Sequence, residues 1–263
     1  MSKAGGFHHI IRRLSMSTYP QPTAERANEL VANYNRCYDL VQSIAKQYRP
    51  SPVRLVAVSK LKPSSDIMGL YNAGVRHFGE NYVQELISKS KELPKDICWH
   101  FIGGLQSGKV KDLAKHIDNI WAIETMDSLK KCKKLASLLD GSRAPINIYL
   151  QINTSGEDQK SGFSKDDLQE LFDTVEFLKS DDCKHLNLKG LMTIGSFAES
   201  TSGDENQDFR CLVDIKAIVD EKFKTNLELS MGMSSDYEQA IKQGSTNVRI
   251  GSSIFGARPP KGT

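Results

Sequence analysis

Lys60 follows a short apolar run, at a position where its side chain could act as a nucleophile. Residues 54–59 read RLVAVS, and the alternation of a strand places Lys60 on the same face as Val56 and Val58. An ammonium group beside apolar walls loses hydration, so we expect the pKa of Lys60 to fall and its neutral amine to condense with an aldehyde. The alternative is a solvated lysine at a strand end, which is the commoner role of a lysine taken alone.

Two loops rich in glycine and serine could hold a phosphate group. Residues 230–234 read SMGMS and residues 251–253 read GSS. Glycine lets backbone N–H groups approach an anion, a helix N-terminus adds its positive end, and Ser230 and Ser252 can donate from their hydroxyls. The alternative is ordinary turn chemistry, because glycine and serine are common in loops.

Arg249 lies between Val248 and Ile250 at the close of the last apolar run. A guanidinium group is always protonated and offers only hydrogen-bond donors. Arg249 could therefore donate to a ligand atom that carries a lone pair. The alternative is a structural arginine inside the fold, paired with an acid such as Glu80 or Glu124.

Regular elements must position these residues. Apolar residues recur at spacings of three and four from Thr23 to about Arg49, which predicts one long helix. Short apolar runs then alternate with helical stretches to the end of the chain. The predicted strands are residues 54–59, 76–79, 98–102, 119–123, 146–152, 188–194, 227–231 and 247–250.

This alternation predicts a parallel sheet, because parallel strands need a crossover of about a dozen residues between them. Eight strand-helix units favour a closed (β/α)₈ TIM barrel with an additional N-terminal helix, and an open doubly wound sheet is the alternative. Ser164 is the expected cap of the helix after the fifth strand. Ser234 or Ser235 is the expected cap of the helix after the seventh.

A barrel would place its site at the carboxyl ends of the strands, and the usual phosphate site there is formed by the loops after strands seven and eight. Both loops described above lie at that location. The strand-end candidates are Lys60, Glu80, Asn81, Gly103, Gly104, Glu124, Gln151, Asn153, Thr193, residues 230–233 and residues 249–253. His100 alternates with Cys98 and Ile102, and we expect it to pack in a barrel layer rather than act as a base.

Composition excludes several classes of function. The 263 residues include 35 basic and 32 acidic residues, so the net charge of +3 gives no basic stripe for nucleic acid. Five cysteines form no CxxC pair, which predicts neither disulfides nor a zinc site and fits a reducing, cytoplasmic location. No apolar run approaches the ~18 residues of a membrane span. No histidine spacing indicates a metal.

We expect residues 21–263 to form one domain and residues 1–20 to be a disordered tail. The tail carries Lys3, Arg12 and Arg13 with no acid before Glu25, so a mitochondrial transit peptide is the alternative. Met16 could also serve as the start of the chain.

Seven ordered segments resemble the pyridoxal phosphate homeostasis proteins, and together they cover residues 55–258. The segments are VAVSKLKP (56–63), FGENYVQE (78–85), WHFIGGLQ (99–106), NTSGEDQKSG (153–162), GLMTIG (190–195), LSMGMSSDYEQAI (229–241) and VRIGSSIFGAR (248–258). One departure is visible, since the family usually reads LQxNK where residues 105–109 read LQSGK.

The resemblance implies a fold-type III barrel like the N-terminal domain of alanine racemase, with pyridoxal 5′-phosphate (PLP) held as a Schiff base on Lys60. It also implies that Arg249 faces the pyridine nitrogen and that Asn81 lies near the ring. Met192 and Met233 would lie near the ring faces. Phosphate contacts would come from Ser230, Gly232, Gly251 and Ser252.

The implied function is binding and buffering of intracellular PLP by a monomer, with PLP-dependent apoenzymes as possible recipients and no catalytic residue. An arginine at the pyridine nitrogen agrees, because it cannot leave that nitrogen cationic and the ring becomes a poor electron sink. Racemases of this fold need a second base from an extra domain, and 13 residues after Ile250 cannot form one. The alternatives are an amino-acid racemase or lyase on the same scaffold and a barrel that binds another phosphate ester.

Overall fold

A computed structural model of the chain describes residues 19–157, 159–200 and 205–257. The first element is the predicted long helix, α1 (Ala24–Tyr48), whose start is capped by the Thr23 side chain accepting from the Arg26 N–H. Most of the tail predicted to be disordered, residues 1–18, lies outside the described residues, as does Met16.

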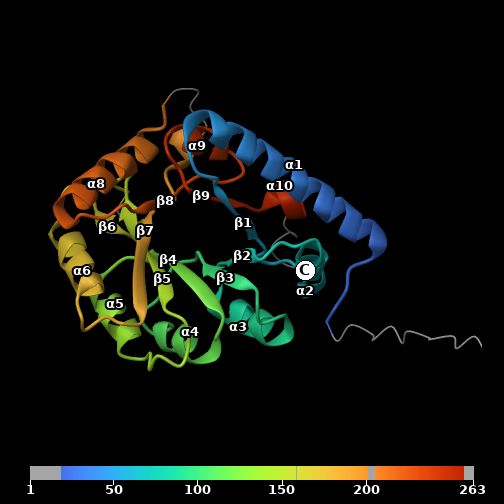
Figure 1. The fold of residues 1–263 in the computed structure, drawn as a ribbon, viewed down its shortest axis with the longest axis horizontal. Coiled ribbons are helices and arrows are strands. Elements are labelled where there is room, and N and C mark those ends of the chain that lie inside the picture. Colours follow the sequence, from blue (N-terminus) through green and yellow to red (C-terminus); the bar gives the residue numbers. More distant parts are fainter. Residues whose placement is uncertain (1–18, 158, 201–204, 258–263) are drawn as a thin grey trace, which may run out of the picture.

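Eight parallel strands close into a ring, which confirms the (β/α)₈ barrel (Figure 1). They are β1 (Arg54–Val58), β2 (His77–Glu80), β3 (Cys98–Phe101), β4 (Ile120–Met126), β5 (Ile146–Asn153), β7 (Leu186–Met192), β8 (Glu228–Ser230) and β9 (Asn247–Ile250). Each pairs with its neighbour in this order, and β9 pairs with β1 to close the ring.

Helices surround the ring and return the chain from one strand to the next. They are α2 (Ser64–Asn72), α3 (Val83–Glu92), α4 (Val110–His116), α5 (Leu129–Ala136), α6 (Gln169–Lys179), α7 (Phe197–Ser200), α8 (Gln207–Phe223), α9 (Tyr237–Lys242) and α10 (Ser252–Phe255). The additional helix α1 crosses the outside of the barrel against α2, α9 and α10 (Figure 1).

The predicted cap Ser164 is wrong, and the cap predicted near Ser234 or Ser235 is the next residue, Asp236. A short strand that the sequence did not predict, β6 (Phe163–Ser164), pairs with β5 outside the ring, and α6 begins only at Gln169. The α9 helix begins at Tyr237, and the side chain of Asp236 accepts from the Met233 N–H at 2.6 Å. The N-cap of α9 is Asp236, whose side chain makes no capping hydrogen bond to this helix.

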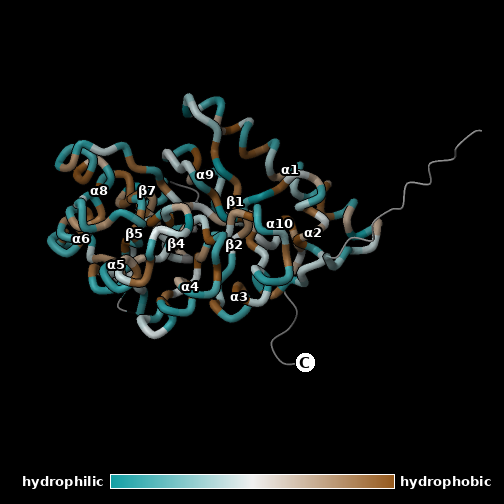
Figure 2. Tube along the Cα trace, turned by 60° about the horizontal axis from the view of Figure 1, so that its bottom comes forward, coloured by the Kyte–Doolittle hydropathy of each residue, from teal (hydrophilic) through white to brown (hydrophobic). Residues whose placement is uncertain are grey.

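The main hydrophobic core lies between the strands and the helices, where residues such as Leu55 and Ala57 point outward from β1. Figure 2 shows the outer helices, such as α6, as largely hydrophilic and the hydrophobic residues as concentrated toward the strands. Inside the ring only a small apolar cluster forms, around Tyr149 and Met192. Polar side chains such as His100, Glu124 and Ser230 are also buried, and they contact one another. No helix of the described segments is long and apolar enough to cross a membrane.

Candidate functional site

A pocket of about 330 Å³ opens at the carboxyl ends of the strands. Small-molecule sites begin at about 300 Å³, so the pocket can hold a compact ligand. It is lined by Val58, Lys60, Asn81, Ile102, Met192, Ile194, Met233, Ser234, Ser235, Arg249, Gly251 and Ser252. These residues follow or end β1, β2, β3, β7, β8 and β9, which is the face on which sites of this fold are found.

The structure brings six of the eight residues predicted to bind the ligand into this one pocket. They are Lys60, Asn81, Met233, Arg249, Gly251 and Ser252. Lys60 is half-buried in the turn after β1 and shares the pocket with Val58, in keeping with the strand alternation. The preceding residue, Ser59, is buried, and its N–H donates to Gly79 of the next strand at 2.9 Å.

Arg249 is buried, and its guanidinium group is held from inside the barrel. It donates to the Ser230 hydroxyl at 2.6 Å and to the Thr193 carbonyl at 2.9 Å. Burial lowers the pKa of Arg249, while the charges of Glu124 and Asp236 oppose that shift. The alternative prediction was an ion pair between Arg249 and Glu124. The two groups are joined indirectly, through the Ser230 hydroxyl, which contacts both.

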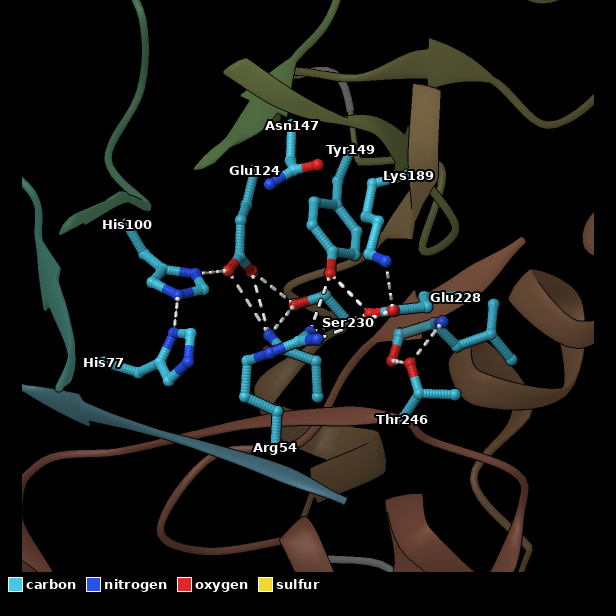
Figure 3. A network of polar contacts seen from close by, with 12 residues as sticks. Arg54, His77, His100, Glu124, Asn147, Tyr149, Lys189, Glu228, Ser230 and Thr246 are labelled. Atoms are coloured by element: carbon cyan, nitrogen blue, oxygen red, sulfur yellow. Dashed lines mark hydrogen bonds and ion pairs between the residues drawn. The ribbon is translucent and has the colours of Figure 1, made fainter. Parts of the chain in front are cut away.

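Ser230 does not line the pocket, although the sequence placed it at the phosphate. Its hydroxyl donates to Glu124 at 2.5 Å (Figure 3). It accepts from Asn247 at 3.0 Å and also from Arg249. A hydroxyl has one proton and two lone pairs, so these three contacts use its whole capacity. Ser230 therefore belongs to the barrel interior.

The same network fixes the histidine tautomers (Figure 3). Burial alone would raise the pKa of Glu124, but the hydrogen bond from His100 and the charge of Arg249 lower it, so Glu124 is an anion. Burial lowers the pKa of His100 and lowers that of His77 to about 3, so both rings are neutral. His100 then carries its proton on Nδ1, donated to Glu124 at 2.5 Å, and accepts from His77 Nδ1 at 2.9 Å. The prediction that His100 packs in a barrel layer is confirmed.

A second set of polar groups lies nearer the amino ends of the strands. Glu228 accepts from Arg54 and from the Tyr149 hydroxyl, each at 2.7 Å, and pairs with Lys189 at 2.9 Å (Figure 3). The half-buried charged groups are hydrogen-bond and charge partners of one another, which offsets the cost of removing them from water. They fill the barrel where most proteins of this fold place branched apolar residues.

Gly232 also lies outside the pocket lining, and its contribution is conformational. Its φ of +98° is in the left-handed region, and an added Cβ would lie 2.6 Å from the Cβ of Ala240. Its carbonyl accepts from the Arg249 N–H at 3.0 Å. Gly232 thus shapes the loop after β8 and ties it to β9, without itself reaching the pocket.

Sequence reasoning missed Ser234 and Ser235 as pocket residues, because it assigned them to a helix cap. Ser234 accepts from the Gly251 N–H at 3.3 Å, so the loops after β8 and β9 meet at this hydroxyl. Its position beside Met233, in the loop that the sequence analysis had already selected as a phosphate site, could have indicated Ser234. Ile102 and Ile194 were missed as well, since nothing in an apolar residue type marks it as a pocket wall.

Asn81 enters the pocket with an unused hydrogen-bonding atom. Its Oδ1 is buried, and no residue that the structure describes donates to it. Gly103 permits this placement, because a Cβ there would lie 2.0 Å from the Asn81 carbonyl oxygen. The Gly103 carbonyl is held in turn by the Thr125 hydroxyl at 2.6 Å. Gly103 therefore serves close packing beside the site, whereas a Cβ at Gly104 would meet no atom within 4 Å.

The remaining strand-end candidates do not line this pocket. Gly104, Gln151, Asn153 and Thr193 line a neighbouring pocket of about 190 Å³, which shares the wall formed by Ile194. Glu80 is buried outside both and contacts α3. Within residues 19–157, 159–200 and 205–257, no three His, Cys, Asp or Glu side chains gather where they could hold a metal ion.

Comparison with known proteins gives a consistent assignment. Residues 33–259 match the family model for the alanine racemase N-terminal domain. The pyridoxal phosphate homeostasis protein of Schizosaccharomyces pombe is 46% identical over 230 residues, which cover 87% of this chain and 94% of that protein. The human protein of the same name is 42% identical over 230 residues, covering 82% of each chain.

A solved structure agrees with the sequence matches. PipY of Synechococcus elongatus, determined with PLP bound, is 31% identical and covers 83% of this chain and 99% of its own, with a TM-score of 0.65. The matches to the homeostasis proteins extend over most of both chains. This chain is therefore a member of the pyridoxal phosphate homeostasis protein family.

Proposed function

We propose that this protein binds PLP reversibly through a Schiff base on Lys60 and thereby buffers the cofactor in the cell. The observation that carries the proposal is the joint presence of Lys60, Arg249 and the Gly251 loop in one pocket of about 330 Å³. An amine, a fixed guanidinium group and a glycine-serine loop are the groups that an aldehyde, a pyridine nitrogen and a phosphate each require. The names of the relatives and the PLP-bound PipY structure support the same cofactor.

The residues present fit the three ends of PLP. Lys60 would supply the amine that condenses with the aldehyde, and the condensation would form a C=N bond and release one water. Gly251 lines the pocket and packs closely on β1, where an added Cβ would lie 3.3 Å from Val58. Ser252 and Ser234 add hydroxyl donors beside it.

The ring contacts fit as well. Asn81 Oδ1 can accept a hydrogen bond from a ligand hydroxyl, which would satisfy an atom that no described residue satisfies. Met192 and Met233 supply polarizable side chains for an aromatic ring. Arg249 donates from a rigid position, because Ser230 and Thr193 fix its guanidinium group.

Exchange with solution is compatible with this pocket. Ser252 and Ser235 are exposed, and Ile194 is 39% exposed, so part of the pocket wall faces solvent. A cofactor bound there has a route to solvent through this part of the wall. Reversible release is what buffering needs.

The pocket chemistry favours a carrier over a racemase or lyase. Among the described residues that line it, Lys60 is the only side chain able to act as a general base, since Arg249 stays protonated. Catalysis of proton exchange on both faces of an amino acid requires a second base, and such acid-base groups contribute about 10²- to 10⁴-fold each. An assay of amino-acid racemisation tests this choice, and turnover well above that of free PLP would contradict the carrier.

Absorption spectroscopy tests the cofactor assignment. We expect added PLP to give wild-type protein a visible Schiff-base band that Lys60→Ala lacks. Lys62→Ala is the matched control, because Lys62 is the nearest lysine along the chain and does not line the pocket. A band retained in Lys60→Ala, or lost in Lys62→Ala alone, would move the linkage to another residue.

The proposal extends to delivery. A monomeric cytoplasmic protein with an accessible pocket could pass PLP to apoenzymes, with a mitochondrial pool as the alternative location. Mixing the loaded protein with a PLP-dependent apoenzyme should restore that enzyme faster than spontaneous release allows. Restoration at the rate of release into a PLP trap would contradict direct delivery and leave passive buffering.

A further inference from the structure

Lys89 on α3 reaches the turn that carries Lys60. Its ammonium group donates to the Ser59 carbonyl at 2.9 Å, to Glu80 at 2.7 Å and to Glu85 at 2.6 Å. An ammonium group has three donors, and these three contacts use all of them. Lys89 does not line the pocket, so any effect on a ligand must act through the residues that it contacts.

Those partners hold the chain on both sides of Lys60. The Ser59 hydroxyl donates to Glu80 Oε1 at 2.6 Å, and the Leu61 N–H donates to Glu85 Oε1 at 2.7 Å. Leu61 needs such a restraint, because its φ of +60° lies in the left-handed region, which costs a residue with a Cβ about 1–2 kcal/mol. The two residues next to Lys60 are therefore fixed from β2 and α3.

The network is costly in solvation. The side chains of Glu80 and Lys89 are 0% and 6% exposed, and burying such a pair costs desolvation that its attraction often fails to recover. In addition, Glu80 Oε2 has no hydrogen-bond partner among the described residues. A contribution to stability is thus a poor explanation, whereas a contribution to the geometry of the turn agrees with every contact.

We propose that Glu80, Glu85 and Lys89 are positioning residues that direct the Lys60 amine toward the aldehyde. This inference rests on the proposed function, because it assigns a role in forming the Schiff base. The three residues act through Ser59 and Leu61 and leave the phosphate and ring contacts to other loops. Their loss should affect the reaction of the amine and spare the recognition of the rest of the ligand.

Two ligands separate these effects. PLP reacts with the amine, whereas pyridoxine 5′-phosphate has the same ring and phosphate but an alcohol in place of the aldehyde. In Lys89→Met we expect the equilibrium constant for PLP loading, followed by the visible band, to fall by about tenfold, as misplacement of a reacting group implies. The affinity for pyridoxine 5′-phosphate, measured by calorimetry, should stay within about twofold of wild type, which is less than about 0.4 kcal/mol.

Matched variants guard against general damage. Lys91→Met removes an exposed lysine of the same helix and should change neither affinity. Burial raises the pKa of Glu80 to about 7, so Glu80 can take up a proton when Lys89 is lost and the variant can still fold. Glu85→Ala is a second route to the same defect, because Glu85 is only partly buried. Glu85→Gln keeps an acceptor for the Leu61 N–H and should recover part of the loading.

The outcomes are distinct. Wild-type PLP loading in both Lys89→Met and Glu85→Ala would overturn the inference. An equal loss of affinity for the two ligands would also overturn it, since the network would then support the pocket as a whole. A wild-type protein that binds pyridoxine 5′-phosphate but never forms the band would refute the proposed function and this inference together, whereas failure of the variants alone to differ refutes only the inference.

Discussion

Arg249 illustrates how single side chains are prepared in this protein. Its guanidinium group is buried, yet its donors to the interior are already taken by Ser230 and Thr193. The chain of contacts continues from Ser230 to Glu124 and on to His100, so each group fixes the next. A donor held in this way loses little freedom when a ligand binds, which favours affinity through preorganisation.

Gly232 gives a stability prediction at the same scale. In Gly232→Ala the new methyl group meets Ala240 at 2.6 Å, and the backbone must keep a φ of +98°. We expect the free energy of unfolding to fall by about 1–3 kcal/mol. Urea denaturation measures it. Gly108→Ala is the control, because a Cβ there has no atom within 4 Å, and an equal loss in both variants would contradict the reason given.

The sequence was sufficient to predict those pocket residues whose type and place at a strand end indicate their chemistry. Lys60, Arg249 and the Gly251 loop were found because their positions at strand ends favoured a binding role over a solvated lysine, a structural arginine and an ordinary turn. Ser230 and Ser234 were exchanged, since a hydroxyl serves equally in an interior network or a pocket. The direction of each side chain decides, and distant partners set it. Ser230 donates to Glu124, which is 106 residues away, whereas Ser234 accepts from Gly251.

At the scale of elements, α1 secures the loop that follows the last strand. Arg26 donates to Asp66 of α2 at 2.7 Å and to the Phe255 carbonyl of α10 at 2.8 Å. The α10 helix begins at Ser252, directly after the predicted phosphate contact Gly251. The additional helix therefore supports the pocket although it does not line it.

Arg26→Ala should weaken this connection. We expect a loss of about 1–2 kcal/mol in the free energy of unfolding, because the buried Asp66 and the Phe255 carbonyl lose a charged donor. Thermal or urea unfolding of the protein without ligand measures it. Arg36→Ala, at an exposed position of the same helix, should stay within about 0.5 kcal/mol. Similar losses for the two arginines would show that α1 does not secure α10 through Arg26.

The order of elements followed from periodicity, while some boundaries did not. Strands and helices alternate with distinct periods, so the barrel and α1 could be predicted. The strand β6 has only two residues, which is too short for any alternation to show. The helix starts after β6 and β8 were misplaced because Ser164, Ser234 and Asp236 are all capable caps, and tertiary contacts select among them.

The whole molecule should respond to acid through its buried histidines. The pKa of His77 is lowered to about 3 in the folded chain, against about 6.5 when unfolded. The unfolded chain therefore binds more protons between these values. This contribution to stability is present above pH 6.5 and is lost as the pH falls toward 3.

His77→Asn isolates that contribution, because an amide can still donate to His100 but does not titrate. Between pH 7 and pH 5, we expect wild type to lose about 1–2 kcal/mol more in the free energy of unfolding than the variant. Urea denaturation at the two pH values gives the comparison. Equal losses would mean that His77 is not held neutral inside the barrel.

The proposed function and the role of the pocket depend on which lysine forms the covalent link to PLP. The loaded protein can be reduced with borohydride, which converts a Schiff base into a stable amine, and then digested for mass spectrometry of its peptides. At equimolar PLP we expect the phosphopyridoxyl group on the peptide that contains Lys60 and on no other peptide. The group on a different lysine, or no labelled peptide from a protein that retains PLP, would contradict this expectation.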